Sequence, residues 1–212
     1  MDICRQLSPN FGPRRFGLVP RYIVLHHTAM PCAQDAIARL CDPSAEVSAH
    51  YLISGAGNVT QMVEEADRAW HAGAGEWCGL DDLNSRSIGI ELDNTGTHPF
   101  SNPQMQVLEQ LLKQIMVRWN IGPHGVIGHS DMAPGRKFDP GPWFDWARLE
   151  KQGLAAPRGH HKLQAGGRDA FLRAAVGAGF TCAAPFEDVL SAVRLRFAPW
   201  RQGPLVAADF SF

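Results

Sequence analysis

Long apolar runs are missing from this sequence of 212 residues, and its apolar segments fall far short of the roughly 20 residues that a membrane-spanning helix needs. Positive and negative charges nearly cancel, with 20 Lys and Arg against 21 Asp and Glu, and neither sign forms a stripe or a tail. We therefore expect no membrane span and no nucleic-acid partner. A Gly-rich phosphate-binding loop is also absent, so no nucleotide cofactor is indicated.

The N-terminal segment lacks the features of an export signal. Its residues, MDICRQLSPNFGPRRFG, are polar and interrupted by proline, with no apolar core and no cleavage site. We expect a cytoplasmic protein, and the cell envelope is the alternative if an export signal has been removed.

Cysteine is scarce, and its five copies follow no recognisable pattern. An odd number without CxxC spacing argues against a disulfide framework and a zinc ribbon, and it fits a reducing compartment. We expect each thiol to be a small buried side chain. The five are Cys4, Cys32, Cys41, Cys78 and Cys182.

The sequence does contain enough apolar residues, 45%, for the core of one domain of ordinary size, or of one domain with a small appendage. Apolar runs predict strands at 23–25, 87–92 and 125–128 and a hairpin within 49–63. Helical spacing predicts helices over 32–41 and 102–119, the second with Asn102 as its N-cap and Pro103 at its first helical position. Strands mixed with helices up to residue 150 indicate an α/β fold built on one sheet.

The composition changes after residue 150. Residues 151–167 are rich in Gly, Pro, Ala and charge and predict a linker. Residues 168–212 contain two short helical patterns, which are too small to bury much surface alone. We expect this pair of helices to pack on the main domain.

An irregular segment, GHSDMAPGRKFDPGP at residues 128–142, carries several ionisable side chains among prolines and glycines. We predict that it is neither helix nor central strand. His26 and His27 end one strand, and His129 and Asp139 lie in this segment, so two imidazoles and a carboxylate could form a catalytic zinc site. Since neighbouring strand residues point to opposite faces, only one of His26 and His27 can face it. Histidines at strand ends are also often surface or hydrogen-bonded core residues, and spacing alone does not decide between these alternatives.

Five motifs, in their order and spacing, resemble those of the zinc-dependent N-acetylmuramoyl-L-alanine amidases of the amidase-2 type: IVLHHTA, SAHYLI, AWHAG, SIGIEL and GHSDMAPGRKFDPGPWF. Peptidoglycan recognition proteins share that fold. The resemblance covers roughly residues 8–150 and is nearest to the bacterial branch of cytoplasmic anhydromuropeptide amidases and their outer-membrane lipoprotein relatives. It implies a central mixed β-sheet flanked by helices, with a catalytic domain at 1–150. The tail at 168–212 resembles, more weakly, a truncated peptidoglycan-binding module.

The resemblance implies a role for each residue of the site. His26, His129 and Asp139 would bind Zn²⁺. Glu91 would be the general base that takes a proton from the zinc-bound water, and an apolar strand would raise its pKa toward neutral pH. Lys137 would stabilise the oxyanion of the tetrahedral intermediate.

Further residues fall in motifs that line the groove in this family. We expect His50 and His71 to contact substrate or to support the site from behind it. Trp70 and Asn84 are groove candidates, and Arg136 could pair with a carboxylate of the stem peptide.

The remaining histidines carry no predicted role in catalysis. We expect His98 and His124 on the surface and His160 and His161 in solvent.

The implied activity is hydrolysis of the amide between N-acetylmuramic (or 1,6-anhydro-N-acetylmuramic) acid and L-alanine. The partners would be peptidoglycan or soluble muropeptides, bound by a monomer. One competitor is a non-catalytic muropeptide-binding protein, which would not need Glu91 and Lys137 beside a ligand set. Another is a zinc peptidase or deaminase, and neither the HExxH nor the PCxxC signature is present.

Overall fold

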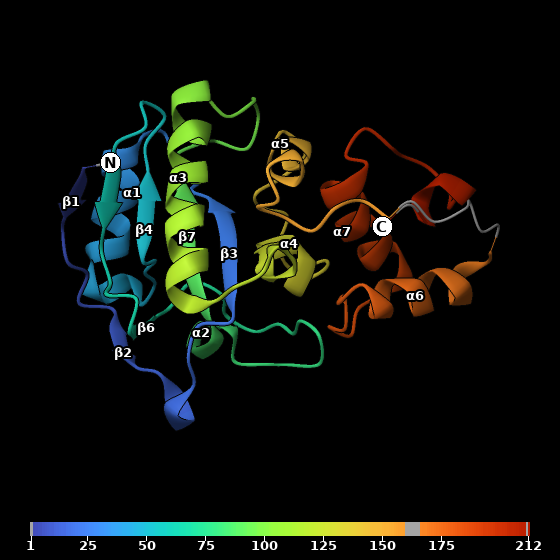
Figure 1. Ribbon diagram of the computed structural model, residues 1–212, viewed down its shortest axis with the longest axis horizontal. Coiled ribbons are helices and arrows are strands. Elements are labelled where there is room, and N and C mark those ends of the chain that lie inside the picture. The colour runs from blue at the N-terminus through green and yellow to red at the C-terminus, as the bar shows by residue number, and fades with distance from the viewer. Residues whose placement is uncertain (1, 160–165, 211) are drawn as a thin grey trace.

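A six-stranded mixed sheet forms the centre of the computed structural model, which describes residues 2–159, 166–210 and 212 (Figure 1). The strand order is β1-β5-β4-β7-β3-β8, and β4 pairs with β5 in antiparallel fashion while β3 runs parallel to β7 and β8. Two short strands, β2 and β6, form a separate antiparallel ribbon. The strands are β1 Ile3–Arg5, β2 Phe11–Pro13, β3 Tyr22–His27, β4 Tyr51–Ile53, β5 Val59–Gln61, β6 Asp67–Ala69, β7 Ser87–Leu92 and β8 Val126–Gly128.

Helices flank the sheet, as predicted (Figure 1). The α-helices are α1 Ala33–Cys41, α2 Leu83–Arg86, α3 Asn102–Trp119, α4 His129–Met132, α5 Trp146–Lys151, α6 Arg168–Gly177 and α7 Phe186–Phe197. Short 3₁₀ turns are η1 Arg15–Gly17, η2 Pro43–Ala45, η3 Pro123–Gly125 and η4 Ala207–Phe210.

The side chains of the central strands point alternately to the two faces of the sheet, and these faces pack against different neighbours. On one face Ile23, Leu25 and Ile90 join the largest buried cluster together with apolar side chains of α3 and α5. The other face carries Val24 and His26 on β3, beside Gly89 and Glu91 on β7. One face of the sheet therefore holds the main core, and the other combines a second buried cluster, which includes Val24, with polar side chains near the strand ends.

The long helix α3 lies where the sequence predicts it, but its N-cap was predicted one residue too late. Ser101 is the N-cap, and its hydroxyl accepts a hydrogen bond from the Gln104 amide at 3.2 Å. Asn102 and Pro103 occupy the first two helical positions instead. A serine oxygen caps as well as an asparagine oxygen does, so the sequence alone could not separate adjacent candidates.

The segment at 128–142 is partly helical, so the prediction of a wholly irregular segment was wrong at its start. His129–Met132 form the single turn α4, and irregular turns follow it. The first proline of the segment is Pro134, and a helical turn that ends before it loses no hydrogen bond. The carboxylate of Asp131 accepts a hydrogen bond from the Gly128 amide at 2.8 Å and holds the start of this turn.

The C-terminal helices pack on the main domain, as expected. Phe171 of α6 and Val193 of α7 belong to the same buried cluster as Val24 of β3 and Ile127 of β8. The predicted linker runs from α5 to α6, and its residues 160–165, with His160 and His161, lie outside the described residues. The division into domains at 1–150 and 168–212 stays a prediction, because the two regions share this cluster.

Arg196 of α7 ties the C-terminal region to α4. Its guanidinium donates to Asp131 Oδ2 at 2.6 Å and to the Val126 carbonyl at 3.1 Å, and it lies 4.1 Å from the centre of the Trp146 ring. Both members of the ion pair are almost fully buried. Since Asp131 lies two residues after His129, this ion pair also supports one predicted metal ligand.

Replacing Arg196 with methionine is expected to lower the free energy of unfolding by about 3–5 kcal/mol, because the buried Asp131 carboxylate would lose its counter-charge. Urea unfolding followed by circular dichroism measures the change. The matched control is Arg168→Met, which breaks an exposed pair with Glu187 and should cost about 1 kcal/mol or less. Equal effects of the two substitutions would contradict the structural role of Arg196.

Surface features agree with only some of the predictions. His98 and His124 are exposed, as predicted. The prediction of buried thiols was wrong, because Cys4 and Cys78 are exposed and the other three are half-buried. All five are free, so small size did not lead to burial here.

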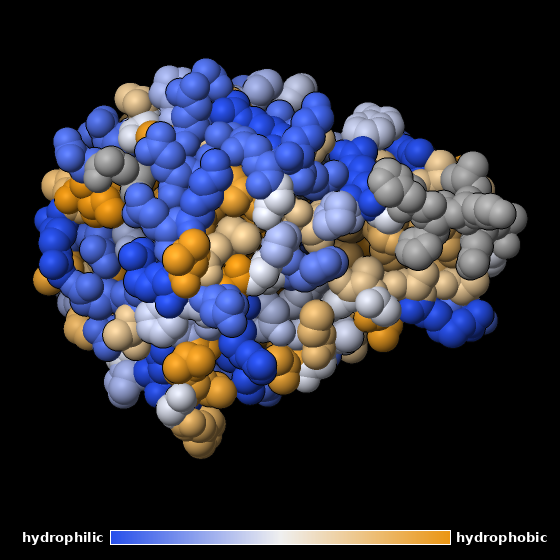
Figure 2. All heavy atoms as spheres, in the orientation of Figure 1, coloured by the Kyte–Doolittle hydropathy of each residue, from blue (hydrophilic) through white to orange (hydrophobic). Residues whose placement is uncertain are grey.

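The visible face of the molecule is mainly hydrophilic, with scattered apolar residues (Figure 2). No helix in the described part of the chain combines the length and the apolar character needed to cross a membrane.

Candidate active site

Three parallel strands bring the predicted site residues to one edge of the sheet. His26 lies near the carboxyl end of β3 and pairs in register with Glu91 of β7, and His129 directly follows β8. The carboxyl ends of parallel strands meet at the same edge, which is where α/β proteins commonly bind ligands. Asp139 reaches the same point from the turns after α4, where its carbonyl accepts a hydrogen bond from the Ser130 amide.

His26, His129 and Asp139 converge on one point. The Nδ1 atoms of the two imidazoles are 2.9 Å apart, and Asp139 Oδ2 lies 2.9 Å from His26 Nδ1 and 3.1 Å from His129 Nδ1. All three side chains are buried or nearly so. Within the described residues, this is the single group of His, Cys, Asp and Glu side chains whose geometry could hold a metal ion.

The positions of the protons decide whether this group suits a cation. His129 Nε2 lies 2.8 Å from the Ala72 carbonyl, which can only accept, so the proton of this imidazole is on Nε2 and Nδ1 presents a lone pair. The pKa of Asp139 lies well below its usual range although burial acts to raise it, so its carboxylate carries no proton. Two lone pairs that face a third imidazole nitrogen are a donor set for a metal ion, and N and O ligands with a fourth position left open suit Zn²⁺.

Burial keeps His26 neutral. Desolvation and the neighbouring His129 lower its pKa to about 4, against the opposing effect of Asp139. A neutral imidazole is the form that binds metal, so this ligand needs no deprotonation at neutral pH.

Glu91 lies beside this group with one oxygen unpaired. Desolvation, and then the nearby Asp139 charge, raise its pKa to about 8, while Lys137 acts in the opposite direction. Glu91 Oε2 is buried without a hydrogen-bond partner. Such a carboxylate is basic enough to take a proton near neutral pH. The Lys137 side chain lines the same pocket.

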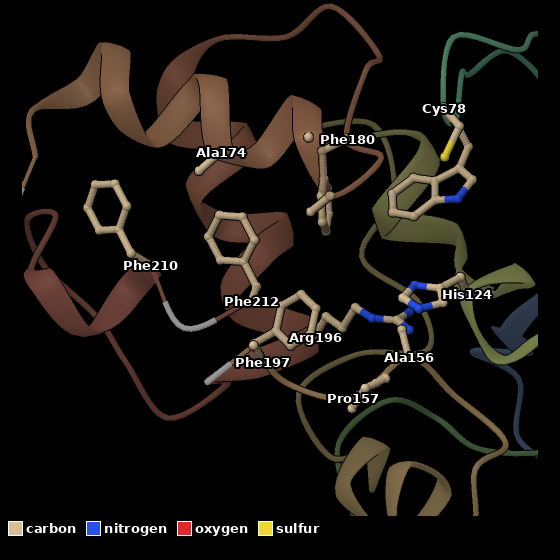
Figure 3. Close-up of a pocket in the computed structure, with 14 residues that line it drawn as sticks. Cys78, His124, Ala156, Pro157, Ala174, Phe180, Arg196, Phe197, Phe210 and Phe212 are labelled. Atoms are coloured by element: carbon tan, nitrogen blue, oxygen red, sulfur yellow. The ribbon is translucent and has the colours of Figure 1, made fainter. Parts of the chain in front are cut away.

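The metal-ligand group opens into a pocket of about 500 Å³, a usual size for a small-molecule site. One wall comes from α1, with Arg39 at the rim, and another from Trp70. A second cavity of about 620 Å³ lies between the C-terminal helices and the sheet domain (Figure 3). It is surrounded by aromatic side chains and contains none of the three candidate ligands, so the smaller pocket is the one that holds the candidate metal site.

The residues predicted to bind substrate lie at different depths. Trp70 lines the pocket. His71 also lines it, but its Nδ1 lies 3.0 Å from His26 Nε2. His50 is fully buried, where its Nδ1 accepts from the Gly89 amide at 3.0 Å.

Asn84 and Arg136 contact the backbone of the segment that follows Trp70. The Asn84 side-chain oxygen accepts from the backbone amides of His71 and Ala72, and the Arg136 guanidinium donates to the Ala72 and Ala74 carbonyls. Substrate contact by these residues stays a prediction, and their positions favour a supporting role.

Two further contacts of the site were not predicted from the sequence. Ser87 Oγ lies 3.3 Å from His71 Nε2, and a Cβ atom on Gly89 would come within 2.4 Å of the His71 ring. A glycine inside the strand SIGIEL was the available signal, because such a residue often marks the close approach of another group.

Acid is expected to destabilise the metal-free protein through three buried histidines. Burial lowers the pKa of His26 to about 4, that of His50 to about 3, and that of His71 well below 6.5. As the pH falls below 6.5, these imidazoles take up protons in the unfolded chain but not in the folded one, so stability decreases. Each would contribute roughly 1.4 kcal/mol per pH unit. Urea unfolding of the metal-free protein at pH 6.5 and pH 5 measures the loss, and an unchanged free energy of unfolding would contradict it.

Comparison with known proteins finds amidases at both the family and the individual-protein level. The family described as Amidase_2, N-acetylmuramoyl-L-alanine amidase, matches residues 16–142. N-acetylmuramoyl-L-alanine amidase AmiD of Escherichia coli (strain K12) is 40% identical over 152 residues, which cover 64% of this chain and 54% of AmiD. The chain thus spans about half the length of that relative. 1,6-Anhydro-N-acetylmuramyl-L-alanine amidase AmpD of Haemophilus influenzae is 36% identical over 164 residues, which cover 68% of this chain and 89% of AmpD.

Solved structures with this fold include that of E. coli AmiD in complex with the substrate anhydro-N-acetylmuramic acid-L-Ala-D-γ-Glu-L-Lys. It superposes with a TM-score of 0.82 at 31% identity and covers 97% of this chain and 90% of that one. AmpDh3 from Pseudomonas aeruginosa superposes with a TM-score of 0.83 at 30% identity and covers 97% and 92%. The likeness therefore extends over the C-terminal helices as well as the sheet.

Proposed function

The chain belongs to the N-acetylmuramoyl-L-alanine amidase family, and we propose that it uses a zinc ion to hydrolyse the amide between the lactyl group of the muramic acid and L-alanine. The observation that carries this proposal is the convergence of His26, His129 and Asp139 in a pocket, beside the unpaired oxygen of Glu91. A protein that only binds muropeptides would gain nothing from a basic carboxylate placed there.

His26, His129 and Asp139 would hold the zinc ion. When bound, zinc would polarise the scissile carbonyl and lower the pKa of a water molecule toward ~7. All other steps would depend on side chains of this chain.

Glu91 would move the proton. Its carboxylate would take one proton from the attacking water as the oxygen bonds to the lactyl carbonyl carbon. The protonated Glu91 would then deliver that proton to the alanine nitrogen as the C–N bond breaks. The products are the lactyl carboxylic acid and a peptide with a free amine, and Glu91 returns to its starting state.

Lys137 would stabilise the charge that develops on the carbonyl oxygen. Its side chain lines the same pocket as Asp139, which follows two residues later in the sequence. A fixed cation in a partly dry pocket lowers the energy of an oxyanion more than it would in water.

The substrate would be a soluble anhydromuropeptide. E. coli AmiD was crystallised with such a molecule as its substrate, and AmpDh3 with an anhydromuramic pentapeptide. A cytoplasmic location would agree with a soluble substrate. The alternative is polymeric cell wall, with a wall-binding role for residues 168–212 and a location in the envelope.

Mass spectrometry of released peptide would test both activity and substrate. Zinc-loaded protein is incubated with intact sacculi or with a soluble anhydro-muramoyl tripeptide, and chelator-treated protein is the control. We expect metal-dependent release from the soluble substrate. Release from sacculi alone would favour the wall substrate, and no release from either by the zinc-bound protein would leave a binding protein on this fold.

A further inference from the structure

We propose that two consecutive residues, His71 and Ala72, form an orienting segment that fixes the tautomers of both metal-binding histidines. His71 would act through its side chain and Ala72 through its carbonyl oxygen. The inference rests on the proposed metal site and assigns a positioning role to residues outside the candidate ligand group.

The hydrogen bonds around His71 can run in one direction only. Ser87 Oγ lies 2.5 Å from the Leu83 carbonyl, which can only accept, so the hydroxyl proton of Ser87 points there. Ser87 Oγ can then only accept from His71 Nε2, at 3.3 Å. With its proton on Nε2, His71 has a free lone pair on Nδ1, and this atom accepts from His26 Nε2 at 3.0 Å.

The direction of this series of hydrogen bonds determines which ring nitrogen of His26 carries the proton. Its neutral imidazole carries one proton, and the hydrogen bond to His71 places that proton on Nε2. Nδ1 is then left with its lone pair facing His129 and Asp139. Without these hydrogen bonds, His26 could carry its proton on Nδ1 and donate to Asp139, which would block metal binding.

Ala72 sets the proton of His129 in the same way. Its carbonyl accepts from His129 Nε2 at 2.8 Å and also from Arg136 Nη2 at 2.7 Å. The second proton of that Arg136 nitrogen points to the Ala74 carbonyl, so the longer 3.4 Å approach of this nitrogen to His129 Nε2 is not a competing donation. Arg136 therefore holds in place the acceptor that orients His129.

Asn84 holds the backbone of the orienting segment. Its side-chain oxygen accepts from the His71 amide at 2.9 Å and the Ala72 amide at 2.8 Å, so one buried atom positions both acceptors. Gly89 provides the space, because the His71 ring packs where a Cβ atom would lie. Loss of the Asn84 oxygen should disturb both metal-binding histidines together.

Zinc affinity, measured by chelator competition on the full chain, tests the role of each residue. His71→Leu is expected to weaken zinc binding by about 10–100-fold, the usual effect of losing a hydrogen-bond partner of a metal ligand. Ser87→Ala and Asn84→Ala act one contact further away, through His71 and Ala72, and are expected to weaken zinc binding in the same direction by a smaller factor. His71→Gln and Asn84→Asp keep an acceptor oxygen and should recover most of the loss. The controls are His124→Ala and Asn58→Ala at exposed positions, which should change the affinity less than twofold. Thermal unfolding identifies any variant that is not folded.

Nitrogen NMR of the histidine rings tests the tautomers directly and needs neither metal nor activity. In the metal-free wild-type protein we expect His26 and His129 to carry their protons on Nε2, and in Ser87→Ala we expect His26 to lose that preference. A proton on His26 Nδ1 in the wild type, or unchanged zinc affinity in folded His71→Leu, would overturn the inference. Zinc that binds as expected without any peptide release would count against the proposed function alone, because the tautomers and affinities would still agree with the orienting segment.

Discussion

His129→Ala is expected to remove bound zinc and to lower the rate of peptide release by about 10³-fold or more. The substitution leaves two of the three metal ligands, and polarisation of the carbonyl and activation of water both depend on the ion, a contribution of several kcal/mol. Metal analysis of the purified protein and the initial rate of release from an anhydro-muramoyl tripeptide measure the two effects.

The matched control for this substitution is His124→Ala. His124 lies five residues earlier, is exposed, and is not among the residues that line the metal pocket. This variant should keep its zinc and at least about half of its activity, since surface substitutions away from a site have small effects. Activity of His129→Ala within tenfold of the wild type would exclude the proposed ligand set.

Glu91→Gln is expected to lower kcat by about 10²–10⁴-fold, the usual contribution of a general acid–base group. Glutamine has nearly the same shape but cannot take a proton from water. Zinc affinity should stay within a few-fold of wild type, because Glu91 is not one of the candidate ligands. Steady-state kinetics together with chelator competition separate the effect on proton transfer from an effect on metal binding.

The pH dependence of activity is a second test of the role of Glu91. Only the ionised carboxylate can accept a proton, so activity should fall as the pH falls through the pKa of Glu91. That pKa is about 8 in the metal-free protein, and a bound cation would lower it. The acid limb should therefore lie below pH 8 in the zinc enzyme and should be absent from the residual activity of Glu91→Gln. The exposed Glu187→Gln is the control and should retain the wild-type profile.

The sequence predicts the sheet domain well because its elements carry local signals. The apolar runs at 23–25 and 87–92 belong to buried strands, and the apolar spacing of 102–119 gives α3 its full length. The short strands β1, β2 and β6 were not predicted, because their residues, ICR, FGP and DRA, form no apolar run, whereas the equally short β4 and β8 do.

The convergence of the site residues could be predicted only through the resemblance to a family. His26 and His129 are separated by 103 residues, and spacing alone left a metal site and ordinary histidines as open alternatives. The arrangement depends on β3 and β8 being neighbours in the sheet, and the sequence of neither segment indicates that pairing.

A supporting role behind the site was one of two alternatives predicted for His50 and His71, but the supporting contacts of Asn84 and Arg136 were not predicted. Asn84 acts on the backbone of His71 and Ala72, and Arg136 acts on a carbonyl 64 residues away. Polar residues in motifs that line a groove are naturally expected to face the substrate. In the structure, the hydrogen-bond partners of Asn84 and Arg136 are instead backbone groups of the protein.

The most direct test of the central claim is a titration of the metal-free protein with Zn²⁺, in which peptide release from a soluble anhydro-muramoyl tripeptide is followed at each addition. The structure has one group that can hold a metal among the described residues. We therefore expect activity to start near zero, to rise in proportion to added zinc and to level off at one ion per chain. Full activity in the metal-free protein, or one tightly bound zinc without peptide release, would contradict the account.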